Sequence, residues 1–147
     1  QFKKNYNDLV KEHGGGNDLS MEKLVVLASI IQGEAMYVDE MPLISSVYHN
    51  RLKKNILLQA DPTIQYLLPK HKNKIYYKDL KIESPYNTYM HKGLPPGPIN
   101  NPGIDALKAA CNPPKTDYYY FVADGKGKHI FSNSYNEHLK AKNNALK

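Results

Sequence analysis

The carboxyl group best placed for chemistry in this 147-residue chain belongs to Glu34. At about 100° per residue, Glu34 falls within about 20° of Leu27 on a helical wheel and so extends an apolar stripe through Ile31. Burial and the negative end of the helix dipole both favour the protonated acid, which is the form that a general acid needs. The periodicity is equally compatible with a solvated Glu34 at a frayed helix end, or with pairing to Arg51 or a lysine.

A second group of side chains is of the kind that binds sugars. Flat aromatic faces and amide or hydroxyl groups on stiff loops suit the apolar faces and hydroxyl groups of a sugar ring. Each residue also has an ordinary structural explanation, since tyrosines fill cores and Asp61 could cap the next helix. The candidates are Gln59, Asp61, Thr63, Tyr86, Asn87, Thr88, Tyr89 and Asn133, together with His138 and the proline-rich residues 93–99.

Other chemistries lack their motifs. The six histidines show neither the HExxH pattern nor clustered Cys/His spacing, so no metal site and no cofactor are expected. There is no G-x-S-x-G elbow, and the glycine triplet at residues 14–16 lacks the lysine and hydroxyl residue of a phosphate-binding loop. Cys111, the single cysteine, is expected to be a small core residue. Serine hydrolases and nucleotide-dependent enzymes are therefore disfavoured.

The charge of the chain points to an anionic partner other than nucleic acid. The formal net charge is +6, but Arg51 is the single arginine, and nucleic-acid recognition depends strongly on arginine. An acidic glycan or an anionic membrane face explains the lysines as well. No apolar run approaches the roughly 18 residues that cross a bilayer. The chain also begins without a methionine, so we expect a fragment whose membrane anchor, if any, lies outside it.

The elements that position these residues follow from local signals. Asp18 and Ser20 are candidate N-caps for a buried helix that ends near Glu34, and Pro42 begins a second helix that stops near Asn55. A turn is expected at residues 61–63, a polar loop at 70–74 and a stiff irregular segment at 84–103. A helix at 104–110, a β-hairpin from residues 118–122 and 129–131, and a last helix capped by residues 132–134 complete the pattern. We therefore predict an α+β, helix-rich, lysozyme-like domain at residues 18–147 with a small hairpin, after a lead segment at 1–17.

Several ordered motifs resemble the MltG/YceG-like endolytic murein transglycosylases. They cover most of the chain from Leu19 to Leu139, and the resemblance fades before Gly16, where family members carry a LysM-like region and, earlier, a membrane anchor. In family members the catalytic glutamate often follows a first acidic residue two positions before it, and here that first position is Gln32. The matching stretches are residues 28–35, 47–52, 58–63, 86–89, 93–99, 101–103 and 120–125.

The resemblance implies a lytic transglycosylase that cleaves the bond between MurNAc and GlcNAc in nascent glycan strands. Glu34 is the implied catalytic residue, acting first as general acid and then as base toward the C6 hydroxyl of MurNAc, so that a 1,6-anhydro end forms. Asp61 and Thr63 are expected to shape the cleft, and residues 86–89 to contact sugar or orient Glu34. Two alternatives remain: a lysozyme-like hydrolase that uses Asp61 as second carboxylate, and a non-catalytic peptidoglycan-binding module.

The resemblance also implies a place and partners. Peptidoglycan glycan strands are the expected binding partner, peptidoglycan synthases are possible ones, and nucleic acid is not expected. The expected location is the bacterial cell envelope, at the extracytoplasmic face of the inner membrane, with contact to the membrane only through an anchor outside this chain.

Overall fold

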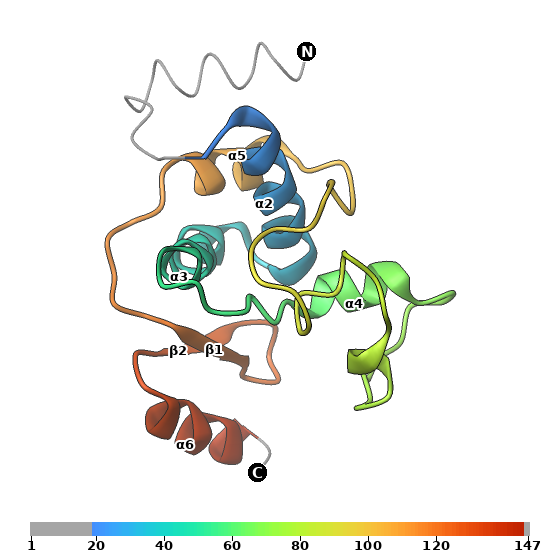
Figure 1. The fold of residues 1–147 in the computed structure, drawn as a ribbon. Coiled ribbons are helices and arrows are strands. Elements are labelled where there is room, and N and C mark those ends of the chain that lie inside the picture. Colours follow the sequence, from blue (N-terminus) through green and yellow to red (C-terminus); the bar gives the residue numbers. More distant parts are fainter. Residues whose placement is uncertain (1–18, 146–147) are drawn as a thin grey trace.

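The structure is a computed structural model that describes residues 19–145 of the chain. The predicted lead segment at residues 1–17 lies outside the described residues. Figure 1 shows a helix-rich arrangement in which a small β-hairpin lies below the central helices, and this confirms the predicted α+β class. The elements, in which η denotes a 3-10 helix, are α2 (Met21–Glu34), η1 (Val38–Glu40), α3 (Met41–Lys53), α4 (Asp61–Leu67), η2 (Asp79–Lys81), α5 (Ile104–Cys111), β1 (Tyr120–Ala123), β2 (His129–Ser132) and α6 (Tyr135–Ala145).

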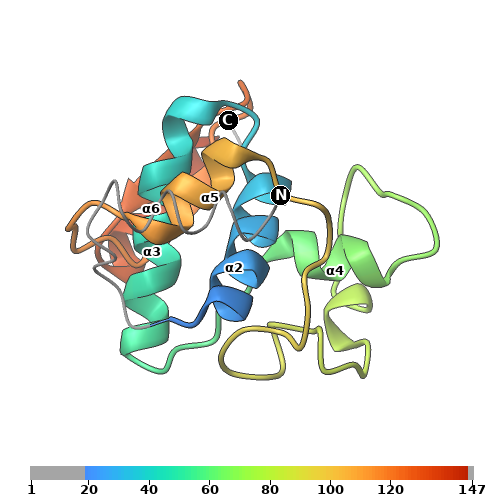
Figure 2. The same cartoon turned by 90° about the horizontal axis from the view of Figure 1, so that it is seen from above.

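Helices α2, α3 and α5 pack against one another and form the core (Figure 2). The predicted N-cap Ser20 accepts a hydrogen bond from the backbone N–H of Lys23, and α2 then runs to Glu34 as expected. Every residue from Val26 to Ile31 is buried, so the middle of α2 is enclosed on all sides rather than along one stripe. The helix reaches the surface only toward its end, which places Glu34 at the edge of the core.

Helix α3 follows the predicted pattern, with Pro42 in its first turn and Asn55 just beyond its end at a positive φ of 56°. Two polar side chains on its buried face tie it to the C-terminal end of α5. The Ser45 hydroxyl donates to the carbonyl of Ala109 at 2.7 Å, and His49 Nε2 lies 2.8 Å from the carbonyl oxygen of Ala110. These contacts satisfy carbonyl groups that the end of a helix leaves without partners.

The hairpin is antiparallel and pairs Ala123 with His129. Its turn contains Gly125 and Gly127 at positive φ, and the Asp124 carboxylate accepts the backbone N–H groups of Lys126 and Lys128. Strand β1 contacts α3, and α6 covers both strands on the other side, as Figure 1 shows. The predicted hairpin and last helix are confirmed, and the hairpin register fixes the position of His129.

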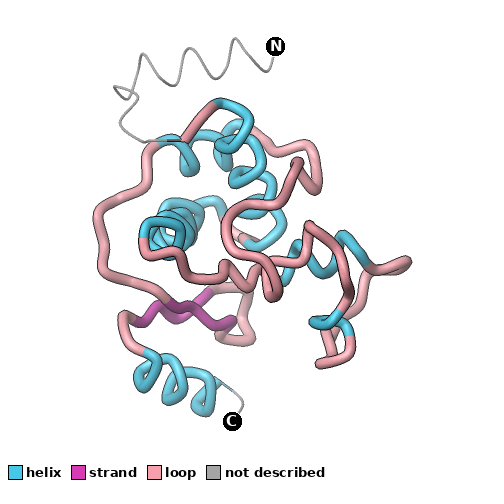
Figure 3. The backbone as a smooth tube through the Cα atoms, in the orientation of Figure 1, coloured by secondary structure: helices cyan, strands magenta, loops and turns pink. Residues whose placement is uncertain are grey.

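The expected turn at residues 61–63 is wrong, because Asp61 begins α4 and Pro62 occupies the first turn of this helix. The irregular segment at 84–103 is confirmed. Figure 3 shows that the chain between α4 and α5 is loop apart from the short η2. Within the described part of the chain, none of the helices combines the length and the apolarity needed to cross a membrane.

Candidate active site

Glu34 is the last residue of α2, and its side chain is 18% exposed. The next residue, Ala35, leaves the helix in an extended conformation while its N–H still donates to the carbonyl of Ile31. The carboxyl group is therefore held by a well-formed helix end rather than by a frayed one. Two pockets meet at this position, and both are lined by Glu34 and Asp61.

One carboxylate oxygen of Glu34 is bound to the hairpin. Its Oε2 lies 3.0 Å from Nε2 of His129, the first residue of β2. The other ring nitrogen, Nδ1, lies 2.8 Å from Oε1 of Glu40, and the backbone N–H of His129 donates to Oε2 of Glu40 at 2.9 Å. The His129 side chain is 5% exposed and Glu40 is buried. A histidine thus lies between two carboxyl groups in a nearly water-free environment.

The surroundings of His129 favour its charged form. Burial opposes the positive charge, but the hydrogen bonds to Glu34 and Glu40 and the negative charges of both residues outweigh this effect and raise the pKa of His129. The histidine consequently holds its proton to a higher pH than an exposed histidine does. A charged partner of this kind strengthens a hydrogen bond to the Glu34 carboxyl group.

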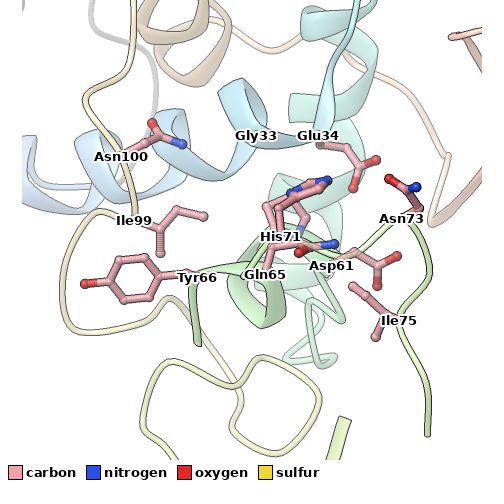
Figure 4. Close-up of a pocket in the computed structure, with 11 residues that line it drawn as sticks. Gly33, Glu34, Asp61, Gln65, Tyr66, His71, Asn73, Ile75, Ile99 and Asn100 are labelled. Atoms are coloured by element: carbon pink, nitrogen blue, oxygen red, sulfur yellow. The ribbon is translucent and has the colours of Figure 1, made fainter. Parts of the chain in front are cut away.

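The first pocket extends from Glu34 along α4 and has a volume of about 450 Å³. Figure 4 shows the side chains of Glu34 and Asp61 on the same side of this pocket, with Asn73 beside them. The loop that carries Asn73 is held against α4, because the Gln65 amide both donates to the carbonyl of Lys72 and accepts its N–H, at 2.7 and 3.0 Å. The predicted polar loop at residues 70–74 is therefore a fixed wall of the pocket.

The second pocket extends from Glu34 to the hairpin and α6, with a volume of about 340 Å³. Aromatic rings line much of it. Tyr120 stacks on His138 with 5.1 Å between ring centroids, and the guanidinium carbon of Arg51 lies 5.0 Å from the Tyr120 ring centroid. Flat rings beside polar groups suit a sugar or an attached peptide. The two pockets together form a groove, called here the Glu34 cleft, that continues on both sides of Glu34 and Asp61.

Asp61 is held by Tyr89, whose hydroxyl donates to Oδ1 of Asp61 at 2.5 Å. Desolvation in the cleft wall raises the pKa of Asp61, the Tyr89 hydrogen bond lowers it and the charge of Glu34 raises it, with a net upward shift. Burial and the Asp61 charge also raise the pKa of Tyr89, so its hydroxyl stays protonated. Of the described residues that line the cleft, Glu34 and Asp61 are the carboxylic acids.

Three of the predicted substrate-binding residues lie in the interior. Thr63 and Thr88 are buried, their hydroxyl groups lie 2.8 Å apart, and Thr88 accepts the N–H of Ala60. Asn87 is also buried, donates to the carbonyls of Leu80 and Ile82 and accepts the N–H of Tyr89. In this structure the polar atoms of these side chains form hydrogen bonds within the protein, and none of the three lines either pocket. They hold the backbone that positions Asp61 and Tyr89.

The other predicted residues lie closer to the surface. Gln59 is exposed, adopts a positive φ of 50° and lines the second pocket. Tyr86 packs against Tyr66, a residue of the first pocket, with 5.1 Å between ring centroids. Asn133 is exposed and donates to Asp117 at 3.3 Å, away from both pockets. The structure therefore brings Gln59, Asp61 and Tyr89 together with Glu34, places Tyr86 behind the rim and leaves Asn133 apart.

The sequence analysis missed His129 and Glu40. A signal for His129 was present, because alternation along β2 places it on the same face of the hairpin as Phe131, which packs against the core. A histidine on an apolar face needs a polar partner. No local pattern could identify that partner, since 95 positions separate His129 from Glu34.

Gln32 points away from the cleft, as the helical wheel indicated. Its Oε1 accepts the backbone N–H of Gly103 at 3.0 Å and so fastens the segment before α5 to α2. We predict that Gln32→Glu changes the rate of a reaction in the Glu34 cleft by less than about twofold, because a carboxylate oxygen accepts the same N–H. Initial rates at saturating substrate measure this. A gain or loss of about tenfold would show that residue 32 takes part in the chemistry.

The histidine, cysteine, aspartate and glutamate side chains of the described residues form no set of three or more placed to hold a metal ion. Acid–base chemistry of carboxyl and imidazole groups is what the cleft offers.

The fold and the site define a class: helix-rich α+β domains that present one histidine-bound carboxyl group between two pockets. The comparisons are more specific. The chain belongs to the YceG-like family, whose model matches residues 1–144. It is 47% identical over 93% of its length to a Bacillus subtilis protein named endolytic murein transglycosylase, and 35% identical over 82% to one of the same name from Streptococcus pneumoniae.

A solved structure supports the same relationship. A YceG-like protein from Listeria monocytogenes matches 92% of this chain with a TM-score of 0.80 and 44% sequence identity. The chain spans 38% and 23% of the length of the two named relatives and 42% of the Listeria chain. The family model, which matches residues 1–144, covers the helices and the hairpin that form the Glu34 cleft.

Proposed function

We propose that this chain carries the catalytic domain of an endolytic lytic transglycosylase, which cleaves the bond between MurNAc and GlcNAc in peptidoglycan. The observation that carries the proposal is the place of Glu34, at a helix end where two pockets meet. Pockets on both sides of the acid suit a strand that continues in both directions, as cleavage within a strand requires. The names of the Bacillus and Streptococcus relatives support the same activity.

The proposed reaction uses the Glu34 carboxyl group twice. The protonated acid gives its proton to the glycosidic oxygen while the bond from that oxygen to C1 of MurNAc breaks. The resulting carboxylate takes the proton of the C6 hydroxyl, and O6 forms a new bond to C1 of the same sugar. The products are a free 4-hydroxyl on GlcNAc and a 1,6-anhydro-MurNAc end. Water is not consumed, so a second carboxylate for its activation is unnecessary.

Mass spectrometry of digested peptidoglycan tests this proposal. We expect MurNAc ends that are lighter by one water than the reducing ends that a hydrolase leaves. The digest should be run in water enriched in oxygen-18, because a hydrolase incorporates the heavy oxygen and a lytic transglycosylase does not. Reducing ends that carry oxygen-18 as the main product would contradict the proposal.

The second candidate function is hydrolysis of the glycan. The observation that favours it is the carboxyl group of Asp61, which lines the same cleft as Glu34. In ordinary glycosidases such a group activates water or attacks C1. Its hydrogen bond from Tyr89 instead fits a group that shapes the cleft. We predict that Asp61→Asn keeps anhydro ends as the product and lowers kcat by less than about tenfold, since the amide oxygen still accepts the Tyr89 hydroxyl.

The matched control for this variant is Asp105→Asn. It makes the same chemical change at the exposed first turn of α5, outside the described pockets, and should leave the rate unchanged. Loss of more than about a thousandfold in Asp61→Asn alone, with heavy-oxygen reducing ends from the unaltered chain, would establish the hydrolase instead.

The location and the partners of the protein are part of the proposal. We infer that it acts on glycan strands at the extracytoplasmic face of the bacterial inner membrane, near the synthases that make those strands, and that any membrane anchor belongs to a part of the protein outside this chain. The net charge of +6 suits a substrate whose stem peptides carry carboxylates. Cell fractionation of the full-length protein and crosslinking to synthases test this placement.

A further inference from the structure

Glu40 holds His129 in one orientation. Its two carboxylate oxygens accept the backbone N–H and contact Nδ1 of the same residue, at 2.9 and 2.8 Å. Glu40 itself is 7% exposed and lies in η1, the short turn that joins α2 to α3. The hairpin is thereby attached to the segment that directly follows Glu34, and the histidine ring cannot rotate without breaking these contacts.

The two carboxyl groups restrict the protonation of His129. A neutral imidazole has one N–H, and an ionised Glu40 requires it at Nδ1. Nε2 would then present a lone pair to Oε2 of Glu34 at 3.0 Å, and the lone pairs of this oxygen would repel it both when Glu34 is ionised and when its proton is on Oε1. A second proton on His129 removes this repulsion and makes both contacts charge-assisted hydrogen bonds.

Other charged groups also lie near His129. Asp124, in the hairpin turn, interacts electrostatically with the histidine. Lys128, the preceding residue, is paired with Asp39 at 2.7 Å, so the charge of this lysine is offset locally. Arg51 and Lys142 line the same pocket as His129. The hydrogen bonds and negative charges of Glu34 and Glu40 nevertheless prevail, and the pKa of His129 is raised despite its burial.

We propose that His129 is a positioning residue for Glu34: Glu40 keeps it as an imidazolium whose Nε2–H donates to Oε2 of Glu34, so that Oε1 is the oxygen that exchanges protons with the glycan. This inference rests on the proposed function. During the reaction the Oε1–H proton moves to the glycosidic oxygen, and Oε1 later receives the C6 hydroxyl proton. His129 keeps both of its protons throughout and stabilises the Glu34 carboxylate that exists between the two transfers.

The test compares three variants with the unaltered chain by their pH–rate profiles. Glu40→Gln removes the negative charge that raises the pKa of His129, so the imidazolium is lost at a lower pH. We expect the alkaline limb of kcat to move down by at least about one pH unit. Glu22→Gln is the matched control, because it makes the same chemical change at an exposed carboxylate in the first turn of α2, and its limb should stay in place.

His129→Gln separates charge from structure. Its amide N–H can still donate to Glu34, but it carries no charge. We expect kcat to fall by about ten- to a hundredfold, while KM stays within about twofold. The alkaline limb of the pH–rate profile that reports the loss of the His129 proton should be absent. A glutamine variant with the kcat and pH profile of the unaltered chain would mean that the histidine is only structural, and an unmoved limb in Glu40→Gln would also overturn the inference.

Nuclear magnetic resonance of nitrogen-15-labelled His129 provides a readout that does not need activity. We expect both ring nitrogens to be protonated in the acid form and a titration midpoint above the ordinary value of about 6.5, lowered in Glu40→Gln and unchanged in Glu22→Gln. A midpoint at or below the ordinary value would overturn the inference whatever the activity. If the titration behaves as expected while the chain cleaves no peptidoglycan, the proposed function fails and the charge assignment of His129 stands.

Discussion

Glu34→Gln is expected to abolish peptidoglycan cleavage, with a fall in rate of at least about a thousandfold. General acid–base catalysis by a positioned side chain contributes about 10² to 10⁴, and the proposed reaction requires this carboxyl group in both steps. The glutamine has nearly the same shape, and its amide oxygen can accept the Nε2–H of His129 that now contacts Oε2 of Glu34. The fold and the affinity for glycan strands should therefore persist, so loss of rate will report on chemistry.

The measurement is release of anhydro-ended fragments from purified peptidoglycan, together with pull-down of the glycan and thermal unfolding. Glu22→Gln is the matched control, because it makes the same change in the exposed first turn of α2, away from the Glu34 cleft. It should retain full activity. Glutamine cannot donate the proton that the reaction needs. A Glu34→Gln chain that keeps more than about a tenth of the rate would therefore show that Glu34 is not the proton donor.

Cleavage should not return when Gln32→Glu is added to Glu34→Gln. The side chain at position 32 points to the N–H of Gly103 and not into either pocket. A carboxylate placed there would remain away from the glycan, because successive helix residues lie about 100° apart. Gln32, which replaces the acidic residue that family members often have at this position, thus affects the packing of α2 against the segment before α5.

The helices could be predicted because their signals are local. Ser20 caps α2 and Pro42 opens α3, and each acts within its own first turn. Asp61 and Pro62 show the limit of such signals. Proline with φ near −65° suits both a β-turn and the first turn of a helix, so the packing of the next few residues decides between them. Here Ile64 is buried in the interior and the helix continues to Leu67.

The position of Glu34 was predicted correctly, although the reason was only partly right. The helical wheel treated α2 as a helix with one apolar stripe, whereas residues 26–31 are buried on all sides. What distinguishes Glu34 is its place at the helix end, where the core meets the cleft. Sequence periodicity describes the faces of a helix, but which end reaches the surface depends on the elements that pack around it.

The partners of Glu34 could not be predicted from local patterns. His129 reaches it because the hairpin register and the docking of β1 on α3 bring residues 95 positions apart into contact. For Thr63, Asn87 and Thr88 the resemblance indicated importance without distinguishing sugar contact from support of the backbone. Both kinds of residue are polar and lie in the same motifs, so only their burial separates them.

Arg51→Met is expected to lower the free energy of unfolding by about 2–5 kcal/mol. Arg51 is 7% exposed, and its guanidinium donates to the carbonyl of Tyr119 at 2.6 Å and to that of Leu57 at 2.7 Å. Methionine fills similar space but leaves both carbonyl groups without a donor, and each unsatisfied buried polar group costs about 1–3 kcal/mol. The melting temperature should fall by roughly 10 °C for a domain of this size.

The effect should reach the active site, because Arg51 joins α3 to the chain that enters the hairpin carrying His129. Thermal and urea unfolding measure the stability, and Lys53→Met is the matched control. It removes the same charge from an exposed side chain two positions along α3 and should change stability by less than about 0.5 kcal/mol. Equal stability of the two variants would show that the Arg51 hydrogen bonds do not hold the hairpin.

The activity of Arg51→Met, measured well below its melting temperature, separates unfolding from displacement of His129. A rate that stays low while the chain is folded means that the hairpin has shifted relative to Glu34.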